Sequence, residues 1–319
     1  MRTQTWVALT VGITTSLLLA ACGSTDSVGT ASQAQPTSVV TVAAVPADQT
    51  RPSDLVGSWR LLETDEPAGT VVTMSAGLPP GSDSVARTPG GDLYVWRACG
   101  ELSGGWTASA DGLFVSAIDG LGGKCPTREL TTGGPKWLRT AFGFRTDGAD
   151  RLLLDQAGRV TARLAPGGRA TPGPDILASE ADPDPPSDAF IRASVAPPAL
   201  PASVRPALAA ELVGTWVGAS APTPLPKRIS IVAIRADGTW GGTDGCNGIG
   251  GRWASGRGGG LLASSGSSTL IYCDPGKDGD VPTAFDSAAR AGFVGTELVL
   301  FGDRGERLVR LKRVYSRSR

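Results

Sequence analysis

Apolar and polar residues alternate in short stretches along the chain, and glycine or aspartate separates one stretch from the next. Residues 228–242, RISIVAIRADGTWGG, alternate in this way and then turn at Asp237-Gly238. Two apolar stretches joined by a Gly/Asp turn also occur at 151–164 and at 297–311. This alternation is typical of β-hairpins with one buried face. The pattern therefore predicts antiparallel strands throughout the chain.

Helical spacing of apolar residues occurs in two places. Residues 281–293 bring Phe285 and Phe293 close to one helical face, with Pro282 near the start. Residues 135–142 are a shorter counterpart. We therefore expect a mainly β (α+β) fold, in which two small antiparallel sheets, barrel-like in form, each carry one short helix.

Four landmarks recur in the same order in the two halves. DLVGSWRLLE at 54–63 is matched by ELVGTWVGAS at 211–220. In each half a cysteine follows, with a tryptophan seven residues after it. A second cysteine comes 26 residues after the first in one half and 27 residues after it in the other, and a hairpin closes each half. This order predicts a duplicated domain. The first half is longer between its first tryptophan and first cysteine, so we expect an added loop within 68–91.

Proline-rich and polar stretches divide the chain. We predict a signal peptide at 1–21, a flexible tether at 22–50, a first domain at 51–165, a proline-rich linker at 166–208 and a second domain at 209–315. The prolines of the linker argue against regular helix or central strand. Its aspartates at 182, 184 and 188 resemble a calcium site, but the prolines interrupt any ligand loop, so a solvated linker is the better interpretation.

The N-terminus predicts a membrane anchor. Arg2 precedes a soft apolar stretch, Trp6 to Ala21, which is shorter than a transmembrane span requires and suits an export signal. Leu19-Ala20-Ala21-Cys22 resembles the lipobox of bacterial lipoproteins. By that resemblance Cys22 carries the lipid (diacylglycerol and palmitate) and the protein lies outside the cytoplasm on the bacterial cell membrane. An ordinary signal peptide is the alternative.

The remaining four cysteines occupy matching positions in the two halves. The symmetric solution pairs Cys99 with Cys125 and Cys246 with Cys273, which an extracytoplasmic compartment permits. Free buried thiols are the alternative. A redox role lacks the close CxxC spacing, and a zinc site would need ligands from both domains.

Composition excludes several classes of function. The chain has no histidine, which removes Ser-His-Asp and Cys-His catalysis and histidine-containing metal sites. Its 30 basic and 30 acidic residues balance, so no general attraction to nucleic acid follows. The acidic pairs Asp147/Asp150 and Asp303/Glu306 lie in turn contexts. We therefore expect no enzyme, no cofactor and no metal site.

The second half resembles the META/HslJ-like domain of bacterial envelope proteins. The resemblance lies in Leu212 to Trp216, in Gly245-Cys246-Asn247 with Gly251 and Trp253, and in Thr269 four residues before Cys273. The first half departs from it, with Ala98-Cys99-Gly100-Glu101 in place of GCN. The resemblance implies a small sheet curled around a helix and an envelope or stress-associated role, with no catalytic residues.

Residue type alone suggests structural roles for several positions in the second half. Asn247 and the glycines suit positive φ in a tight turn, and Trp216 and Trp253 suit the core. The basic C-terminus from Arg307 to Arg319 is the polar face of a last strand and its tail, or a contact for anionic lipid.

The expected function is thus that of a non-enzymatic, membrane-tethered envelope lipoprotein, whose partner is an envelope protein or a wall polymer. The alternative is a calycin-like module that binds a small apolar ligand inside a barrel.

Overall fold

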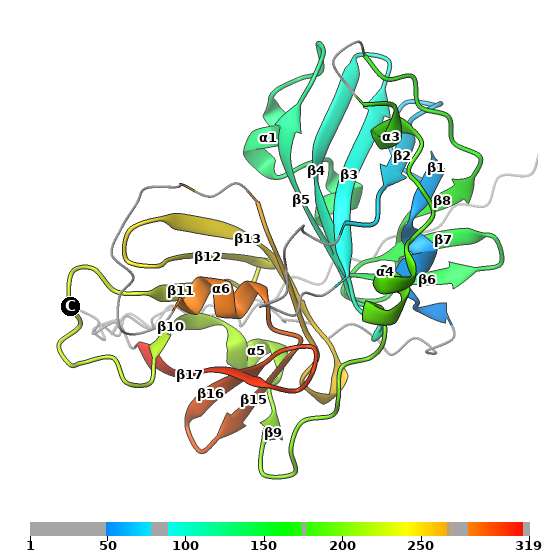
Figure 1. Ribbon diagram of the computed structural model, residues 1–319. Helices are drawn as coiled ribbons and strands as arrows, with labels where there is room; N and C mark the ends of the chain where they lie inside the picture. Colours follow the sequence, from blue (N-terminus) through cyan, green and yellow to red (C-terminus); the bar gives the residue numbers. More distant parts are fainter. Residues whose placement is uncertain (1–48, 78–88, 174–176, 267–268, 270–279, 315–319) are drawn as a thin grey trace, which may run out of the picture. The chain divides into compact units, whose positions relative to one another are not determined.

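Two antiparallel β-sheets and a few short helices make up the chain (Figure 1). The computed structural model describes residues 49–77, 89–173, 177–266, 269 and 280–314. All of these residues belong to a single unit, Thr37–Arg319. The predicted mainly β class is therefore confirmed.

The first sheet has eight strands in the order β5-β4-β3-β2-β1-β8-β7-β6. Two helices, α1 (Arg128–Thr132) and α2 (Lys136–Arg139), lie between β5 and β6 in the chain, and α2 confirms the helix expected within 135–142. The strands are β1 (Gly57–Leu62), β2 (Val71–Met74), β3 (Gly90–Arg97), β4 (Gly100–Ala108), β5 (Phe114–Leu121), β6 (Gly143–Asp147), β7 (Asp150–Leu154) and β8 (Val160–Pro166).

The second sheet has nine strands in the order β14-β13-β12-β11-β10-β17-β16-β15-β9. Helix α5 (Ala209–Leu212) lies between β9 and β10 in the chain, the short η3 (Arg257–Gly259) lies between β13 and β14, and α6 (Val281–Asp286) lies before β15. The strands are β9 (Arg205–Pro206), β10 (Gly214–Gly218), β11 (Ile231–Ile234), β12 (Thr239–Thr243), β13 (Gly248–Ser255), β14 (Leu261–Ser265), β15 (Arg290–Val294), β16 (Glu297–Phe301) and β17 (Arg307–Val314).

Apart from the edge strand β9, the two sheets have the same strand order, with β1 to β8 corresponding to β10 to β17. Their irregularities also correspond. A register shift between Leu153 and Leu154 is matched by one between Leu300 and Phe301. The turns before β7 and β16 contain Gly148 and Gly295, each with a φ of 60°. We refer to residues 52–166 and 209–314 as the first and second repeats.

The shared tryptophan of the two repeats has the same role in each. Trp59 donates its indole N–H to the carbonyl of Leu55 at 2.9 Å, and Trp216 donates to the carbonyl of Leu212 at 2.7 Å. Leu55 ends the short helix η2 (Pro52–Leu55), and Leu212 ends α5. The indole therefore ties the entering helical turn to the central strand while its ring fills the core, which explains why LVG-Ser/Thr-Trp recurs.

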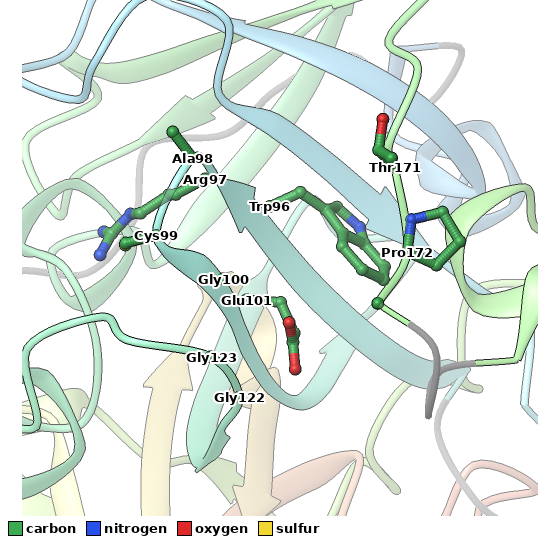
Figure 2. Close-up of a pocket in the computed structure, with 11 residues that line it drawn as sticks. Trp96, Arg97, Ala98, Cys99, Gly100, Glu101, Gly122, Gly123, Thr171 and Pro172 are labelled. Atoms are coloured by element: carbon green, nitrogen blue, oxygen red, sulfur yellow. The ribbon is translucent and has the colours of Figure 1, made fainter.

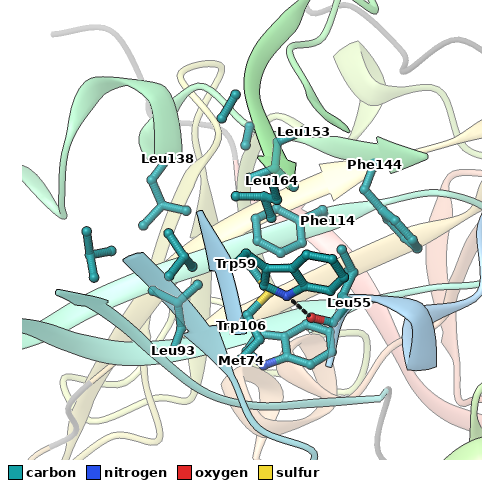
Figure 3. Packing of buried hydrophobic residues seen from close by; sticks show 14 of the residues in the cluster. Leu55, Trp59, Met74, Leu93, Trp106, Phe114, Leu138, Phe144, Leu153 and Leu164 are labelled. Carbon is teal, nitrogen blue, oxygen red and sulfur yellow. Dashed lines mark hydrogen bonds between the residues drawn. The ribbon is translucent and has the colours of Figure 1, made fainter. Parts of the chain in front are cut away.

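Large side chains fill the space inside each sheet. Figure 3 shows Trp59, Trp106 and Phe114 packed together in the first repeat. Trp216, Trp240 and Phe285 form the corresponding core of the second repeat, and both predicted core tryptophans there, Trp216 and Trp253, are buried.

The sheets are curled but are not closed barrels. Strands β5 and β6 of the first repeat, and their counterparts β14 and β15 of the second, are joined by no ladder but by one isolated bridge each, Leu113–Gly143 and Gly260–Arg290. A calycin-like site needs a closed barrel with room for a ligand. The packed cores give this alternative no support.

Three local expectations need correction. The predicted helix 281–293 ends at Asp286, and residues 290–294 form strand β15 instead. The linker contains two short helices, α3 (Ala178–Ala181) and α4 (Asp188–Ala193), because each fits in the few residues between prolines. Thr50, at the end of the expected tether, is buried and donates its hydroxyl to the carbonyl of Ala110 at 2.7 Å.

The extra residues of the first repeat fall between β2 and β3, within the expected range 68–91, although residues 78–88 lie outside the described residues. Strands β2 and β3 are separated by residues 75–89, whereas their counterparts β11 and β12 are separated only by residues 235–238.

Candidate functional site

A disulfide stabilises the β3–β4 end of the first repeat. The sulfur atoms of Cys99 and Cys125 lie 1.93 Å apart, and the bond joins the β3–β4 turn to the segment between β5 and α1. This is the pair expected from the duplication. Cys246 is also disulfide-bonded. Its expected partner Cys273 and the expected lipid-bearing Cys22 lie outside the described residues, so those assignments stay predictions.

The GCN turn of the second repeat is held by an aspartate. Asp244 accepts hydrogen bonds from the backbone N–H groups of Cys246 at 2.7 Å and Asn247 at 2.6 Å, and these bonds lower its pKa. Gly245 has the expected positive φ, at 99°, but the expectation for Asn247 is wrong, because its N–H closes the turn in an ordinary conformation. The turn is structural.

The first repeat carries a pocket at the same end of its sheet. This cavity of about 530 Å³ lies beside the β3–β4 turn and is lined by Trp96, Glu101, Gly122, Thr171 and Pro172, among others. Figure 2 shows the Trp96 indole beside the Pro172 ring, with the Glu101 side chain on the neighbouring strand. We call it the β3–β4 pocket.

The sheet and the segment that follows it build the β3–β4 pocket together. Trp96 on β3 and Glu101 on β4 are cross-strand partners, so their side chains lie on the same face of the sheet. Leu102, the next residue along β4, points into the core on the opposite face. The chain after β8 returns over the outer face, where Ala181 of α3 packs in one apolar cluster with Trp96 and Val71. This packing holds the indole in place as a wall.

Gly122 gives the Glu101 carboxylate its position. A Cβ atom on Gly122 would lie 1.5 Å from Oε1 of Glu101, so only glycine leaves room for the carboxylate there. Within the described part of the chain, no hydrogen bond or ion pair reaches this carboxylate. The pocket therefore contains a negatively charged group that is free to bind a ligand.

The surroundings of the pocket are acidic. Tyr94 stacks on Trp96 with ring centroids 5.3 Å apart. Burial raises the pKa of Tyr94, and so do a hydrogen bond with Glu180 and the charges of Glu180, Asp92 and Glu101. These carboxylates give the outer face of β3 and β4 a negative potential.

Arg97 also lines the β3–β4 pocket, but its guanidinium is paired with carboxylates outside it. The Arg97 side chain points away from the Trp96 indole (Figure 2). It is 8% exposed and pairs with Glu66 and Glu129, where Trp137 also donates its indole N–H to Glu66 at 3.0 Å. These partners raise the pKa of Arg97 against the opposing effect of its burial. Its charge is therefore committed to the opposite face of the sheet.

The second repeat lacks both functional side chains of the pocket. In the first repeat Trp96 pairs with Val71 of β2 and with Glu101 of β4. At the equivalent register of the second repeat, Thr243 pairs with Ile231 and with Gly248. The indole and the carboxylate thus correspond to a threonine and a glycine, so the pocket chemistry belongs to the first repeat.

Acidic pairs noted in the sequence have structural roles. Asp147 and Asp150 both pair with Arg163, at 3.2 and 2.9 Å. Arg163 also pairs with Glu63. Asp303 and Glu306 lie in the β16–β17 turn, where Glu306 accepts the N–H of Arg304. Neither pair is arranged as a general acid and base.

The basic C-terminal strand is held by the fold as well. Arg310 pairs with Glu297, Lys312 donates to the carbonyl of Ala221, and Arg313 stacks on Trp216. Arg317 and Arg319 lie outside the described residues.

The described residues contain neither a metal-binding cluster nor a membrane-spanning helix. There, no group of three or more Cys, Asp or Glu side chains is arranged to hold a metal ion, and the linker aspartates form no such group. None of the helices in the same residues is both long and apolar enough to span a membrane.

Sequence reasoning did not identify the β3–β4 pocket. Its signal was the departure from GCN at residues 98–101, where Glu101 stands at the position of Gly248. Thr171 and Pro172 come from a stretch that reads as a linker, and no local pattern places them beside Trp96.

Comparisons with family models, with curated proteins and with solved structures found no match for this chain.

Proposed function

We propose that this protein is a lipid-anchored, non-enzymatic binding protein of the bacterial envelope. In this proposal Cys22 carries the lipid, and the two repeats stand on the extracytoplasmic face of the membrane. The resemblance of the second repeat to META/HslJ-like domains supports a role in envelope maintenance or the response to stress. Its partner or ligand comes from the envelope.

The β3–β4 pocket is the observation that carries the binding role. It is a cavity of about 530 Å³, within the range of small-molecule sites, and its carboxylate is unpartnered in the described residues. The other acidic pairs considered are used in turns and ion pairs, so they offer no acid and base for catalysis.

The cysteines support the proposed location. Cys99 is bonded to Cys125, and Cys246 is also disulfide-bonded. Stable structural disulfides are typical of compartments outside the reducing cytoplasm. An exported, membrane-anchored protein fits this chemistry.

Metabolic labelling with an alkyne analogue of palmitate tests the anchor. We expect the wild-type chain, expressed in a bacterial host, to incorporate the label and to sediment with membranes. Cys22→Ser is expected to lose both properties, whereas the neighbouring control Ser24→Ala keeps them. A Cys22→Ser chain that retains label and membrane association would contradict the proposal.

A further inference from the structure

We propose that the β3–β4 pocket binds a small organic cation, with the Glu101 carboxylate as its counter-charge and the Trp96 indole as its apolar wall. The inference rests on the proposal that the protein acts by binding, and it adds the chemical class of the ligand.

The charge of the β3–β4 pocket favours a cationic ligand. A carboxylate in a hollow, without a partner in the described residues, gains most from a ligand that brings a positive charge or a strong hydrogen-bond donor. The neighbouring Asp92 and Glu180 add to the negative potential, and Arg97 is paired on the other face. An anionic ligand would meet repulsion here.

The lining of the pocket suits an organic cation better than a metal ion. A hard metal ion needs several oxygen ligands at short distance, and no group of three metal-binding side chains occurs in the described residues. The pocket instead combines one carboxylate with the Trp96 and Pro172 rings. A small ligand with an ammonium group and an apolar remainder would use both the carboxylate and the rings. The ammonium group pairs with the carboxylate, and the indole face attracts cations while it also packs against apolar groups.

The second repeat differs from the first at the two positions that line the pocket with an indole and a carboxylate. The same strand positions there hold Thr243 and Gly248 in place of Trp96 and Glu101. Both repeats build the same sheet, so neither Trp96 nor Glu101 is required by the strand order. Trp96 is also held by packing against Val71 and Ala181 and by its hydrogen bond to Thr73 at 2.9 Å. The Glu101 carboxylate has no such structural partner in the described residues, so the pocket is the feature that gives it a role.

Isothermal titration calorimetry on the full-length lipidated protein in detergent tests the inference at neutral pH. The probe is phenethylamine, which is protonated under these conditions, and phenethyl alcohol is its uncharged counterpart of similar shape. We expect saturable binding of the amine, and an affinity for the alcohol that is lower by roughly tenfold or more, as for the loss of a charged hydrogen bond.

Two variants locate the binding. Glu101→Gln removes the charge, and Gly122→Ala retains it but displaces the carboxylate, because the new Cβ would lie 1.5 Å from Oε1. We expect each to lower the affinity for phenethylamine by roughly tenfold. We expect the urea unfolding midpoint of Gly122→Ala to equal that of the wild type, because the atoms that its Cβ would meet belong to the flexible end of the Glu101 side chain. Asp184→Asn, an equal change of charge at an exposed position, should bind as the wild type does.

The outcomes are separable. Absence of saturable amine binding, equal affinity for the alcohol, or wild-type affinity in Glu101→Gln would each overturn the inference. None of these results would affect palmitate labelling at Cys22, which tests the anchor. Conversely, an unlabelled protein that binds phenethylamine through Glu101 would contradict the anchor and support the pocket.

Discussion

Replacement of Arg97 by methionine is the sharpest test of what holds the first repeat together. Arg97 is 8% exposed and Glu66 is 7% exposed, while Glu129 is 25% exposed. The guanidinium binds Glu66 Oε1 at 2.6 Å and both carboxylate oxygens of Glu129. Methionine keeps most of the side-chain volume and removes the charge, so the variant leaves the buried Glu66 and the partly exposed Glu129 without their shared cation.

The expected cost follows from this burial. Removing one partner of a buried ion pair typically costs about 3–5 kcal/mol, because the remaining charge has lost its compensation. Glu66 keeps one hydrogen bond, from Trp137 at 3.0 Å, which limits the loss but does not neutralise the charge. A loss of this size is a large part of the 5–15 kcal/mol typical of a folded domain.

Urea unfolding, followed by tryptophan fluorescence, measures the change in the free energy of unfolding. Arg163→Met is the matched control, since Arg163 binds three carboxylates, one more than Arg97, but lies in more solvent-exposed surroundings. We expect its unfolding midpoint to stay close to that of the wild type. Equal destabilisation by the two variants would refute the reasoning, because it would mean that the number of ion pairs, and not their burial, sets the cost.

Three further changes test other parts of the fold. Replacing both Cys99 and Cys125 by serine removes the cross-link and should lower the free energy of unfolding by about 3.5 kcal/mol in the chain-entropy model. Reductant should then have no added effect on the stability of that repeat. A free energy of unfolding equal to that of the wild type would contradict this expectation. Asp303 has a pKa raised by burial and by Glu306. Its charged form is thus disfavoured in the folded state, and the wild type loses stability as pH rises from the usual aspartate pKa through the raised one. Asp303→Asn should therefore be more stable than the wild type at neutral pH, with the gain disappearing in acid; thermal melts across pH measure this, and a gain independent of pH would argue against it. Gly104→Ala should lower the free energy of unfolding by about 1–3 kcal/mol, since its Cβ would lie 2.0 Å from the carbonyl oxygen of Ala117. The control Gly105→Ala, whose Cβ would have its nearest neighbour at 3.7 Å, should leave the urea unfolding midpoint nearly unchanged. Similar effects of the two substitutions would contradict the steric argument.

Local sequence patterns were sufficient where one strand or one turn decides the structure. The motif that ends in Trp59 and Trp216 recurs because each indole makes the same hydrogen bond and fills the same part of the core. The hairpin around Asp237-Gly238 formed as expected, since Gly238 has the positive φ of such a turn. These features depend on contacts within a few residues or on strong burial.

The pattern was insufficient where tertiary pairing overrides local spacing. Residues 281–293 have helical spacing, yet Ser287 ends the helix and residues 290–294 pair with strands on both sides. A short apolar run with both faces buried carries no period that separates helix from strand. The β3–β4 pocket was missed for a similar reason. Pro172 lies beside Trp96 only because the chain after β8 returns over the sheet.

The pairing of the first and last strands within each repeat makes the chain suitable for circular permutation. Strand β1 lies against β8, and β10 lies against β17. The start and the end of each repeat are therefore neighbours in space. A circular permutant that joins residues 166 and 57 by a short linker and opens the first repeat at Gly148 would keep every strand pairing except the hairpin it cuts. For the same reason, a gene can acquire a second copy of this module in tandem without disturbing the first.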